Sequence, residues 1–275
     1  MKVVIGIDVG GSTTKIVGFK DENGAKTLIN PIFVRATDPT TSIYGALGRF
    51  TSENGLDLSD INRIMLTGAG AASITKPLYG LKCLQVPEFS CIGRGGIYLS
   101  GLDEAIVISM GTGTALIHSK KDGTIEYLGG TGVGGGTLVG LSNLMLGMND
   151  IGHIEELAVD GDLSKIDLRV RDIVKSSYKD MSDDLTAANF GNVSDIATKN
   201  DIALGIVNMV SETIAMMSIF AARNFGLHDI VLTGNLTTIK PVHKIFTSLK
   251  HTFDMNFIIP ENAQFGTVIG AALTE

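Results

Sequence analysis

The sequence feature that most constrains the fold is a pair of similar glycine-rich turns, each of which follows directly after a run of β-branched residues. The first reads Asp8-Val9-Gly10-Gly11-Ser12-Thr13-Thr14-Lys15, and the second reads Ser109-Met110-Gly111-Thr112-Gly113-Thr114. Glycine lets the backbone approach oxygen atoms closely, while amide, hydroxyl and lysine ammonium groups bind them. An acidic residue at the entry, such as Asp8, can hold a metal ion. The two turns therefore predict a duplicated cradle that holds a polyphosphate from both sides.

The residues around the two turns repeat one order of elements. We expect strands at 1–9 and 16–20, a hairpin turn at 21–24 and a strand at 25–35. The same order returns as strands at 106–108 and 114–118, a hairpin turn at 120–123 and a strand at 125–128. This is a duplication of topology rather than of sequence, and it predicts two related halves.

The rest of the chain alternates between helical and strand-like patterns. Helices are expected at 42–53, just after 68–70, and at 87–100, 137–146, 193–224 and 266–273, with strands at 61–67, 83–86 and 230–233. Such alternation in two halves predicts an α/β protein of two lobes with a cleft between them. The polar segment 160–184 fits either a flexible loop or lid, or a solvated helix with a linker.

Composition narrows the class of protein further. The 275 residues are 44% hydrophobic and 19% charged, which is typical of an ordered globular protein. A formal net charge of -7 argues against a nucleic-acid partner. The two cysteines, Cys83 and Cys91, suit a reducing compartment and need not be paired. The apolar run at 3–7 is too short for a signal peptide or a membrane span, so we expect a cytoplasmic protein with no membrane partner.

Six runs of residues carry a resemblance to a known family. They are Gly6-Ile7-Asp8-Val9-Gly10-Gly11-Ser12, Gly111-Thr112-Gly113-Thr114, Gly134-Gly135-Gly136, Ile166-Asp167-Leu168-Arg169-Val170-Arg171, Asp184-Leu185-Thr186-Ala187-Ala188-Asn189-Phe190-Gly191 and the single Gly234. With them the chain resembles, over nearly its whole length, the type II (bacterial) pantothenate kinases of the actin/sugar kinase/heat-shock ATPase superfamily. The run from Asp184 to Gly191 is specific to that family. The resemblance implies a two-lobed actin-like ATPase (ribonuclease H-like) fold with duplicated mixed-sheet cores, an N-terminal lobe at 1–101 and a C-terminal lobe at 102–275.

The resemblance also implies the cofactors ATP and Mg²⁺, with Asp8 near the metal ion and Glu88 as the catalytic base. The nucleotide-binding residues that it implies are Asp8, Val9, Gly10, Gly11, Ser12, Thr13, Thr14, Lys15, Thr112, Gly135, Gly136, Thr137, Leu138 and Val139, with Ile151 and Asn235 nearer the adenosine. The family is dimeric, and the helix expected at 193–224 is a credible interface. Its stripe of apolar residues fits a dimer interface and an intramolecular core equally well; the stripe is Ile202, Ile206, Met209, Val210, Thr213 and Met217.

The residues around Glu88 suit the role of a base. Glu88 stands at a junction between a strand and a helix, after Pro87 and beside the apolar Val86 and Phe89. Partial desolvation there would raise the pKa of its carboxyl group toward a value useful for proton transfer. The plain alternative is an acid in the first turn of a helix that interacts only with the helix dipole.

The chain departs from the family pattern on the side of the acceptor. The family places a basic residue just before the Gly-Gly that opens the glycine-dense segment, where this chain has Tyr127. The acid two residues beyond the base is replaced by Ser90, and the late Glu-Asn-Gly-Ala-Phe pattern reads Glu261-Asn262-Ala263-Gln264-Phe265. Arg94, Arg169 or Arg171 could replace the lost charge, although nothing in the sequence places them in the cleft.

These observations together predict an ATP-dependent small-molecule kinase that phosphorylates the primary hydroxyl group of pantothenate at the start of coenzyme A synthesis. One alternative is a kinase of the same fold for a different alcohol. Another is an ATP-binding regulator that drives a partner protein. An iron–sulfur activator of this superfamily would need interface cysteines in a glycine-flanked setting, which neither Cys83 nor Cys91 has.

Overall fold

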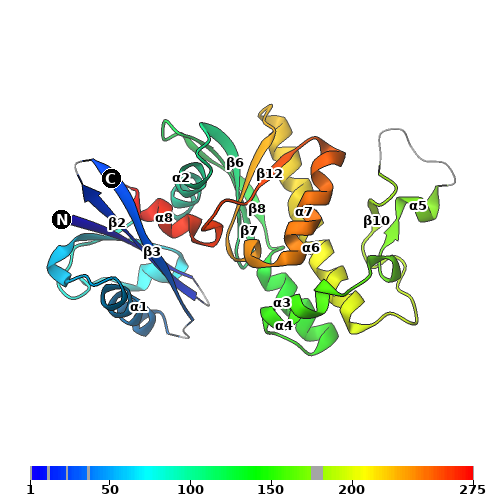
Figure 1. The fold of residues 1–275 in the computed structure, drawn as a ribbon, viewed down its shortest axis with the longest axis horizontal. Helices are drawn as coiled ribbons and strands as arrows, with labels where there is room; N and C mark the ends of the chain where they lie inside the picture. Colours follow the sequence, from blue (N-terminus) through cyan, green and yellow to red (C-terminus); the bar gives the residue numbers. More distant parts are fainter. Residues whose placement is uncertain (1, 11–12, 23, 36–37, 175–181, 275) are drawn as a thin grey trace.

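The chain forms two lobes, each built on a mixed sheet of five strands (Figure 1). This computed structural model describes residues 2–10, 13–22, 24–35, 38–174 and 182–274. In Figure 1 the first lobe lies on the left and the second on the right, with two helices between the sheets. The two-lobed α/β fold expected from the sequence is therefore confirmed.

The sheet of the first lobe has the strand order β3-β2-β1-β4-β5. Its strands are β1 (Lys2–Val9), β2 (Thr13–Glu22), β3 (Ala25–Arg35), β4 (Ile61–Thr67) and β5 (Cys83–Gln85). The first three form an antiparallel meander, and β4 and β5 then join in parallel beside β1. Short 3₁₀ helices precede and follow β4, at Leu58–Asp60 and Ala69–Ser73.

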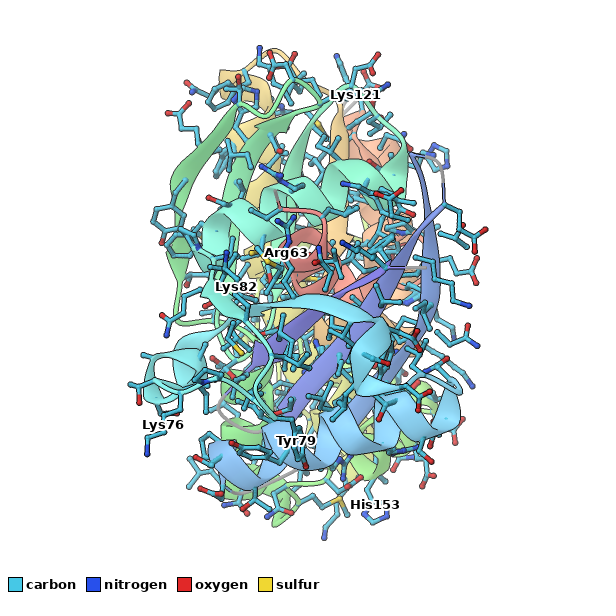
Figure 2. The ribbon with its side chains drawn as sticks, turned by 90° about the vertical axis from the view of Figure 1, so that its left-hand side faces the viewer. Arg63, Lys76, Tyr79, Lys82, Lys121 and His153 are labelled. Atoms are coloured by element: carbon cyan, nitrogen blue, oxygen red, sulfur yellow. The ribbon has the colours of Figure 1, made fainter. Side chains whose placement is uncertain are left out.

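Helix α1 (Pro39–Glu53) covers one face of this sheet. It begins where Asp38 accepts a hydrogen bond from the amide of Thr41, and its apolar residues recur at helical spacing. Ile43, Leu47 and Phe50 are fully buried and pack in one core with the alternate residues of β1. Figure 2 looks onto α1, where the ring of Tyr79 meets the ring of Tyr44 edge to face at 5.1 Å.

The sheet of the second lobe has the order β12-β11-β6-β7-β8. Its strands are β6 (Glu104–Met110), β7 (Thr114–Lys120), β8 (Ile125–Thr131), β11 (Asp229–Thr233) and β12 (Asn256–Ile258). Here too three strands form an antiparallel meander, and two later strands join in parallel beside the first of them. Every strand thus has a counterpart in the first lobe, which confirms the predicted duplication of topology.

Helices α6 (Lys199–Asn224) and α7 (Lys240–Phe253) pack on the outer side of the second sheet, and α3 (Gly135–Leu146) and α4 (Ile151–Val159) pack in turn on α6. The sequence patterns missed α4, α7 and strand β12. They also placed the start of the long helix six residues too early, at 193. Thr198 and Asp201 form a reciprocal capping box that starts α6 at Lys199, and the apolar Val193 and Ile196 before it are exposed.

The apolar stripe of α6 is divided between core and surface. Ile206 and Val210 are fully buried in the core of the second lobe, so the intramolecular alternative is correct for them. Ile202, Met209, Thr213 and Met217 keep part of their surface exposed. Among the described residues, α6 alone is long and apolar enough to cross a bilayer, and most of that stretch is buried inside the protein.

Two helices lie between the sheets and belong to both lobes. α2 (Glu88–Ser100) packs on β6, β7 and β11, whereas α8 (Gly266–Ala272), at the end of the chain, packs on β1, β2 and β4. The end of α8 is held from both sides, because Arg94 donates to the carbonyl of Leu273 at 3.3 Å and Arg63 to that of Thr274 at 3.4 Å. Figure 2 shows Arg63 beside this C-terminal helix. Cys91 on α2 is buried, Cys83 on β5 is half-buried, and both are free thiols.

The segment 160–184 is only partly described, because residues 175–181 lie outside the described structure. Its described part forms a 3₁₀ turn at Leu163–Lys165, strand β9 (Leu168–Arg169) and α5 (Val170–Ile173). Strand β10 (Thr186–Ala188) pairs with β9, and this small unit projects from the outer edge of the second lobe in Figure 1. The described part therefore contains a short strand and a short helix, which neither of the two alternatives, a flexible loop or lid and a solvated helix with a linker, had included.

A polar network attaches the family-specific run 184–191 to α6. The buried Asp167 accepts hydrogen bonds from the amide of Phe190 at 2.8 Å and from Asn208 on α6 at 2.9 Å. Glu212, also on α6, accepts from Thr186 at 2.7 Å and from Asn189 at 3.0 Å. Burial raises the pKa of both carboxyl groups, Asp167 and Glu212, above their usual values. The run thus has a structural role that its sequence did not predict.

Candidate active site

Two adjoining cavities open between the lobes. The first, of about 520 Å³, contains the carboxyl groups of Asp8 and Glu88, and we call it the carboxylate cavity. The second, of about 590 Å³, is lined by Gly135 and Gly136, and we call it the glycine cavity. They share four lining residues: Thr13, Gly111, Thr112 and Asn235. The two glycine-rich turns of the sequence therefore meet at the boundary between the cavities.

A backbone hydrogen bond closes each of the two turns, although the first turn is one residue longer than the second. The amide of Gly10 donates to the carbonyl of Thr13 at 2.9 Å, and the amide of Gly111 donates to that of Gly113 at the same distance. Of the other residues predicted in the first turn, Val9 and Thr14 are buried and support it from within, and Gly11 and Ser12 lie outside the described residues. A Cβ atom at Gly111 would find no other atom nearer than 3.7 Å. The space in front of Gly111 is therefore open to a ligand.

Two further glycines stand at equivalent positions in the two lobes, directly after β4 and directly after β11. The sequence patterns did not single them out as a pair. Gly68 ends β4 with φ of 88°, and Gly234 ends β11 with φ of 92°. A Cβ atom at Gly68 would overlap a carboxylate oxygen of Asp8, and one at Gly234 would lie 2.5 Å from the carbonyl oxygen of Met110. Both sites need glycine for its backbone conformation and for the close approach of a neighbouring strand.

Asp8 and Lys15 face each other across the β1–β2 ladder at the base of the carboxylate cavity. Burial raises the pKa of Asp8 to about 6, against the attraction of Lys15, and the charge of Glu88 raises it further. Burial also lowers the pKa of Lys15, which the charge of Asp8 partly offsets. The Lys15 ammonium group donates to the carbonyl of Gln264 at 2.6 Å. The site therefore holds a poorly solvated carboxylate that a further cation would stabilise.

Glu88 is the first residue of α2, and its carboxyl group opens into the same cavity as Asp8 and Lys15. The cavity walls exclude enough water to raise the pKa of Glu88 above its usual value. The residues around Glu88 in the sequence predicted both the raised pKa of its carboxyl group and its position at a junction between a strand and a helix. A carboxyl group so placed can accept a proton from a hydroxyl group bound in the cavity.

Two aromatic side chains form part of this cavity wall. The rings of Phe89 on α2 and Tyr127 on β8 are stacked, with centroids 4.0 Å apart and planes at 10°. Both rings line the cavity, and each is close to half exposed. Tyr127, at which the sequence departs from the expected basic residue, therefore lies in the wall of the carboxylate cavity.

None of the three arginines considered as replacements for that cation lines the carboxylate cavity. Arg94 binds the end of α8, while Arg169 and Arg171 both bind Asp184 at the outer edge of the second lobe. Among the described residues that line this cavity, Lys15 is the one with a positive charge.

The glycine cavity is lined by five of the seven residues that were expected to bind the nucleotide at positions 135–139, 151 and 235. Gly135, Gly136 and Val139 of α3 line it together with Ile151 and Asn235. The amides of Gly135 and Gly136 donate to the carbonyls of Gly111 and Thr112, both at 2.8 Å, so the glycine-dense segment packs against the second turn. Two further expected residues support this wall: Leu138 is fully buried in the core, and Thr137 donates to the carbonyl of Gly132.

The donor set around Asp8 suits Mg²⁺ that arrives with phosphate groups. Protein-bound Mg²⁺ commonly uses one or two carboxylates and takes its remaining ligands from phosphates and water. Among the described residues, no cluster of three or more His, Cys, Asp or Glu side chains is arranged to hold a metal ion. Asp8, whose pKa is raised by burial, fits the arrangement with one or two carboxylates, because a divalent cation would offset the poor solvation of its carboxylate.

Comparison with solved structures identifies the fold. The activator of 2-hydroxyisocaproyl-CoA dehydratase from Clostridium difficile, with bound ADPNP, matches with a TM-score of 0.68 at 16% identity and covers 98% of this chain and 93% of its own. A ROK family glucokinase from Streptomyces griseus, in complex with glucose and AMPPNP, matches with a TM-score of 0.61 at 14% identity over 98% of both chains. The protein therefore has the actin-like fold of the ATPases and sugar kinases.

Sequence comparison then gives the family. The family model described as Fumble matches residues 104–256. A type II pantothenate kinase from Staphylococcus saprophyticus is 34% identical over 259 residues, which cover 90% of this chain and 91% of that protein. One from Staphylococcus aureus is 30% identical over 98% of this chain and 99% of its own. The chain belongs to the type II pantothenate kinase family.

Proposed function

We propose that this protein is an ATP-dependent kinase that transfers a phosphoryl group to the primary hydroxyl group of pantothenate, the first step of coenzyme A biosynthesis. The observation that carries the proposal is the carboxylate cavity, in which Glu88, Asp8 and Lys15 face one space between two glycine-rich turns. A proton acceptor and phosphate-binding groups within one cavity are what phosphoryl transfer to an alcohol requires. Membership of the type II pantothenate kinase family supports the choice of acceptor.

Glu88 acts as the general base in this proposal. The acceptor hydroxyl lies beside its carboxylate, which takes the proton as the oxygen attacks the terminal phosphorus atom. The pKa of Glu88, raised by burial, makes its carboxylate a stronger base than a solvated glutamate. The stacked rings of Phe89 and Tyr127 form the wall against which the acceptor binds.

The glycine-rich turns and Lys15 bind the phosphate groups. Backbone amides and the Thr13 and Thr112 hydroxyl groups at the shared wall of the two cavities can donate to phosphate oxygens, and Lys15 supplies a positive charge. Mg²⁺ near Asp8, when bound, would neutralise phosphate charge. The glycine cavity would hold the adenosine, because its flat wall of Gly135 and Gly136 lies beside Val139 and Ile151.

The proposal includes a homodimer in the cytoplasm, with lobes divided at residues 1–101 and 102–275. The two sheets fall on either side of residue 101, and α8 then returns to the first sheet. The partly exposed residues of α6 remain available for a contact between subunits.

A screen of ATP consumption tests the function. ADP release is followed with pantothenate, with pantetheine, with a panel of hexoses and with no acceptor. We expect ATP consumption that depends strictly on pantothenate or a pantothenate-like alcohol. Turnover with hexoses alone would show a kinase of the same fold for another alcohol, and slow hydrolysis without any acceptor would show a regulator.

A further inference from the structure

Strand β3 brings a second cation to the same face of the first sheet as Lys15. In the β2–β3 ladder Thr13 is paired with Arg35, and Lys15 is paired with Phe33. Alternate residues of a strand share a face, so Lys15 and Arg35 are diagonal neighbours on the face that looks into the cleft. Phe33 and Arg35 both line the glycine cavity, which agrees with this register.

Arg35 reaches across the cleft to the other lobe. Its guanidinium group lies 3.7 Å from a carboxylate oxygen of Asp150, the residue that caps the start of α4. Both side chains line the glycine cavity, and they come from opposite lobes. Among the described residues that line either cavity, Lys15 and Arg35 are the two with a positive charge.

We propose that Arg35 is a second phosphate-binding cation of the nucleotide site, held at the rim of the cleft by Asp150. This inference rests on the proposed function, because it takes the ligand of the glycine cavity to be a nucleoside triphosphate. Arg35 then binds the phosphate chain from the side opposite the second glycine-rich turn, and the planar guanidinium group can bind two phosphate oxygens at once.

The weakness of the ion pair supports an exchange of partners. The side chains of Arg35 and Asp150 are 70% and 41% exposed, and ion pairs that are so open to water contribute little to stability. Breaking the ion pair with Asp150 therefore costs little free energy, whereas a bound polyphosphate offers several charged oxygens to the guanidinium group of Arg35. Asp150 does not depend on Arg35 either, because it accepts hydrogen bonds from the amides of Gly152 and His153.

The test compares the affinities of ATP and adenosine for Arg35→Ala and for a matched control. Adenosine carries no phosphate, so a phosphate contact affects ATP alone. Arg49→Ala is the control, because Arg49 is also an exposed arginine in an ion pair of the first lobe, 2.6 Å from Glu53 on α1 and away from both cavities. Equilibrium binding is measured without acceptor, and thermal unfolding checks that each variant is folded.

We expect Arg35→Ala to raise the Kd for ATP about tenfold or more, the loss of one charge-assisted contact. The Kd of Arg35→Ala for adenosine should stay within about twofold, because adenosine has no phosphate for Arg35 to bind. Arg49→Ala should change neither Kd, because Arg49 lies away from both cavities. An unchanged Kd for ATP, or an equal rise for ATP and adenosine, would overturn the inference while leaving the proposed function standing. If the wild type binds no ATP, the proposed function fails, and the inference fails with it.

A second variant separates the cation from the ion pair. Asp150→Asn removes the charge of residue 150 and keeps a good cap for α4. If Arg35 serves the nucleotide, this variant should bind ATP as tightly as the wild type or more tightly. A rise in the Kd for ATP as large as that of Arg35→Ala would mean that the link between the lobes matters and that the phosphate contact does not.

Discussion

Replacing Tyr127 with arginine should lower the KM for pantothenate about tenfold. Pantothenate carries a carboxylate, and a carboxylate that loses water on binding needs a cation or several amide donors. Among the described lining residues of the carboxylate cavity, Lys15 alone is cationic, and its ammonium group already binds Gln264 beside Asp8. The wild type should therefore use pantothenate weakly, with a high KM, and should tolerate uncharged pantothenate-like alcohols.

The size of the effect follows from the position of Tyr127. A charge-assisted contact contributes about 1.5–3 kcal/mol, which is roughly a 10- to 150-fold change in KM. Tyr127 is 49% exposed, so solvent screening favours the lower end of that range. Arginine can also stack on Phe89 in place of the lost ring, so the cavity wall should survive the change.

The assay is a coupled measurement of ADP release with pantothenate and with pantetheine as acceptors. Tyr127→Arg should improve the KM for pantothenate and leave that for pantetheine nearly unchanged. Tyr127→Leu, which removes the ring and adds no charge, is the matched control and should show no gain for pantothenate. Tight pantothenate binding by the wild type, with no gain in Tyr127→Arg, would show that another residue supplies the charge and would refute the reasoning.

Four further predictions concern single residues. Glu88→Gln should reduce phosphoryl transfer by roughly 10²–10⁴ and leave ATP affinity nearly unchanged, since the amide keeps the shape and cannot take the proton; turnover above about a third of wild type would exclude Glu88 as the base. Asp8→Ala should weaken ATP binding only in the presence of Mg²⁺, whereas Gly111→Val should block it with or without Mg²⁺ by filling the open space before the second turn; unchanged binding in Gly111→Val would remove that turn from the site. Burial alone would raise the pKa of Asp201, but hydrogen bonds from Thr198 and Asp162 lower it to about 2. The ionised carboxylate therefore stabilises the fold above pH 3.8, and this stabilisation is lost as the pH falls toward 2. In chemical unfolding, Asp201→Asn should therefore cost at most about 2 kcal/mol at pH 7 and have a flatter acid limb, and identical pH profiles would contradict this role.

Most strands of the two large sheets could be predicted, because apolar or β-branched runs between turn residues mark them, but the three-residue strand β12 was missed. The expected strands at 25–35 and 61–67 coincide with β3 and β4, and the helix expected at 87–100 differs from α2 by one residue. The helical pattern failed at 193–198, where apolar residues continue the spacing of α6 but are exposed before its cap. Helix α7 was missed although it is amphipathic, and Pro241 in its first turn resembles a break when only the sequence is read.

The residues of the candidate site that lie together in one short run of sequence could be predicted. Those that reach the site only because distant segments pair with each other could not. Glu88, Lys15 and the two glycine-rich turns meet in one cavity, as their motifs suggested. Arg35 lies in no motif, and only the register of β2 with β3 places it beside Lys15. Leu138 shows the opposite limit, because neighbouring residues of its run line the glycine cavity whereas its own side chain is buried in the core.

Helices α2 and α8 cross each other between the two sheets. A Cβ atom at Gly95 would overlap the carbonyl oxygen of Gly266, and one at Gly270 would overlap that of Cys91, so the two backbones touch with nothing between them. Each helix packs on the sheet of the opposite half of the chain, so this crossing joins the two lobes. One added methyl group at Gly95 would overlap the carbonyl oxygen of Gly266, so α2 and α8 would have to separate, and the two sheets that they carry would shift relative to each other.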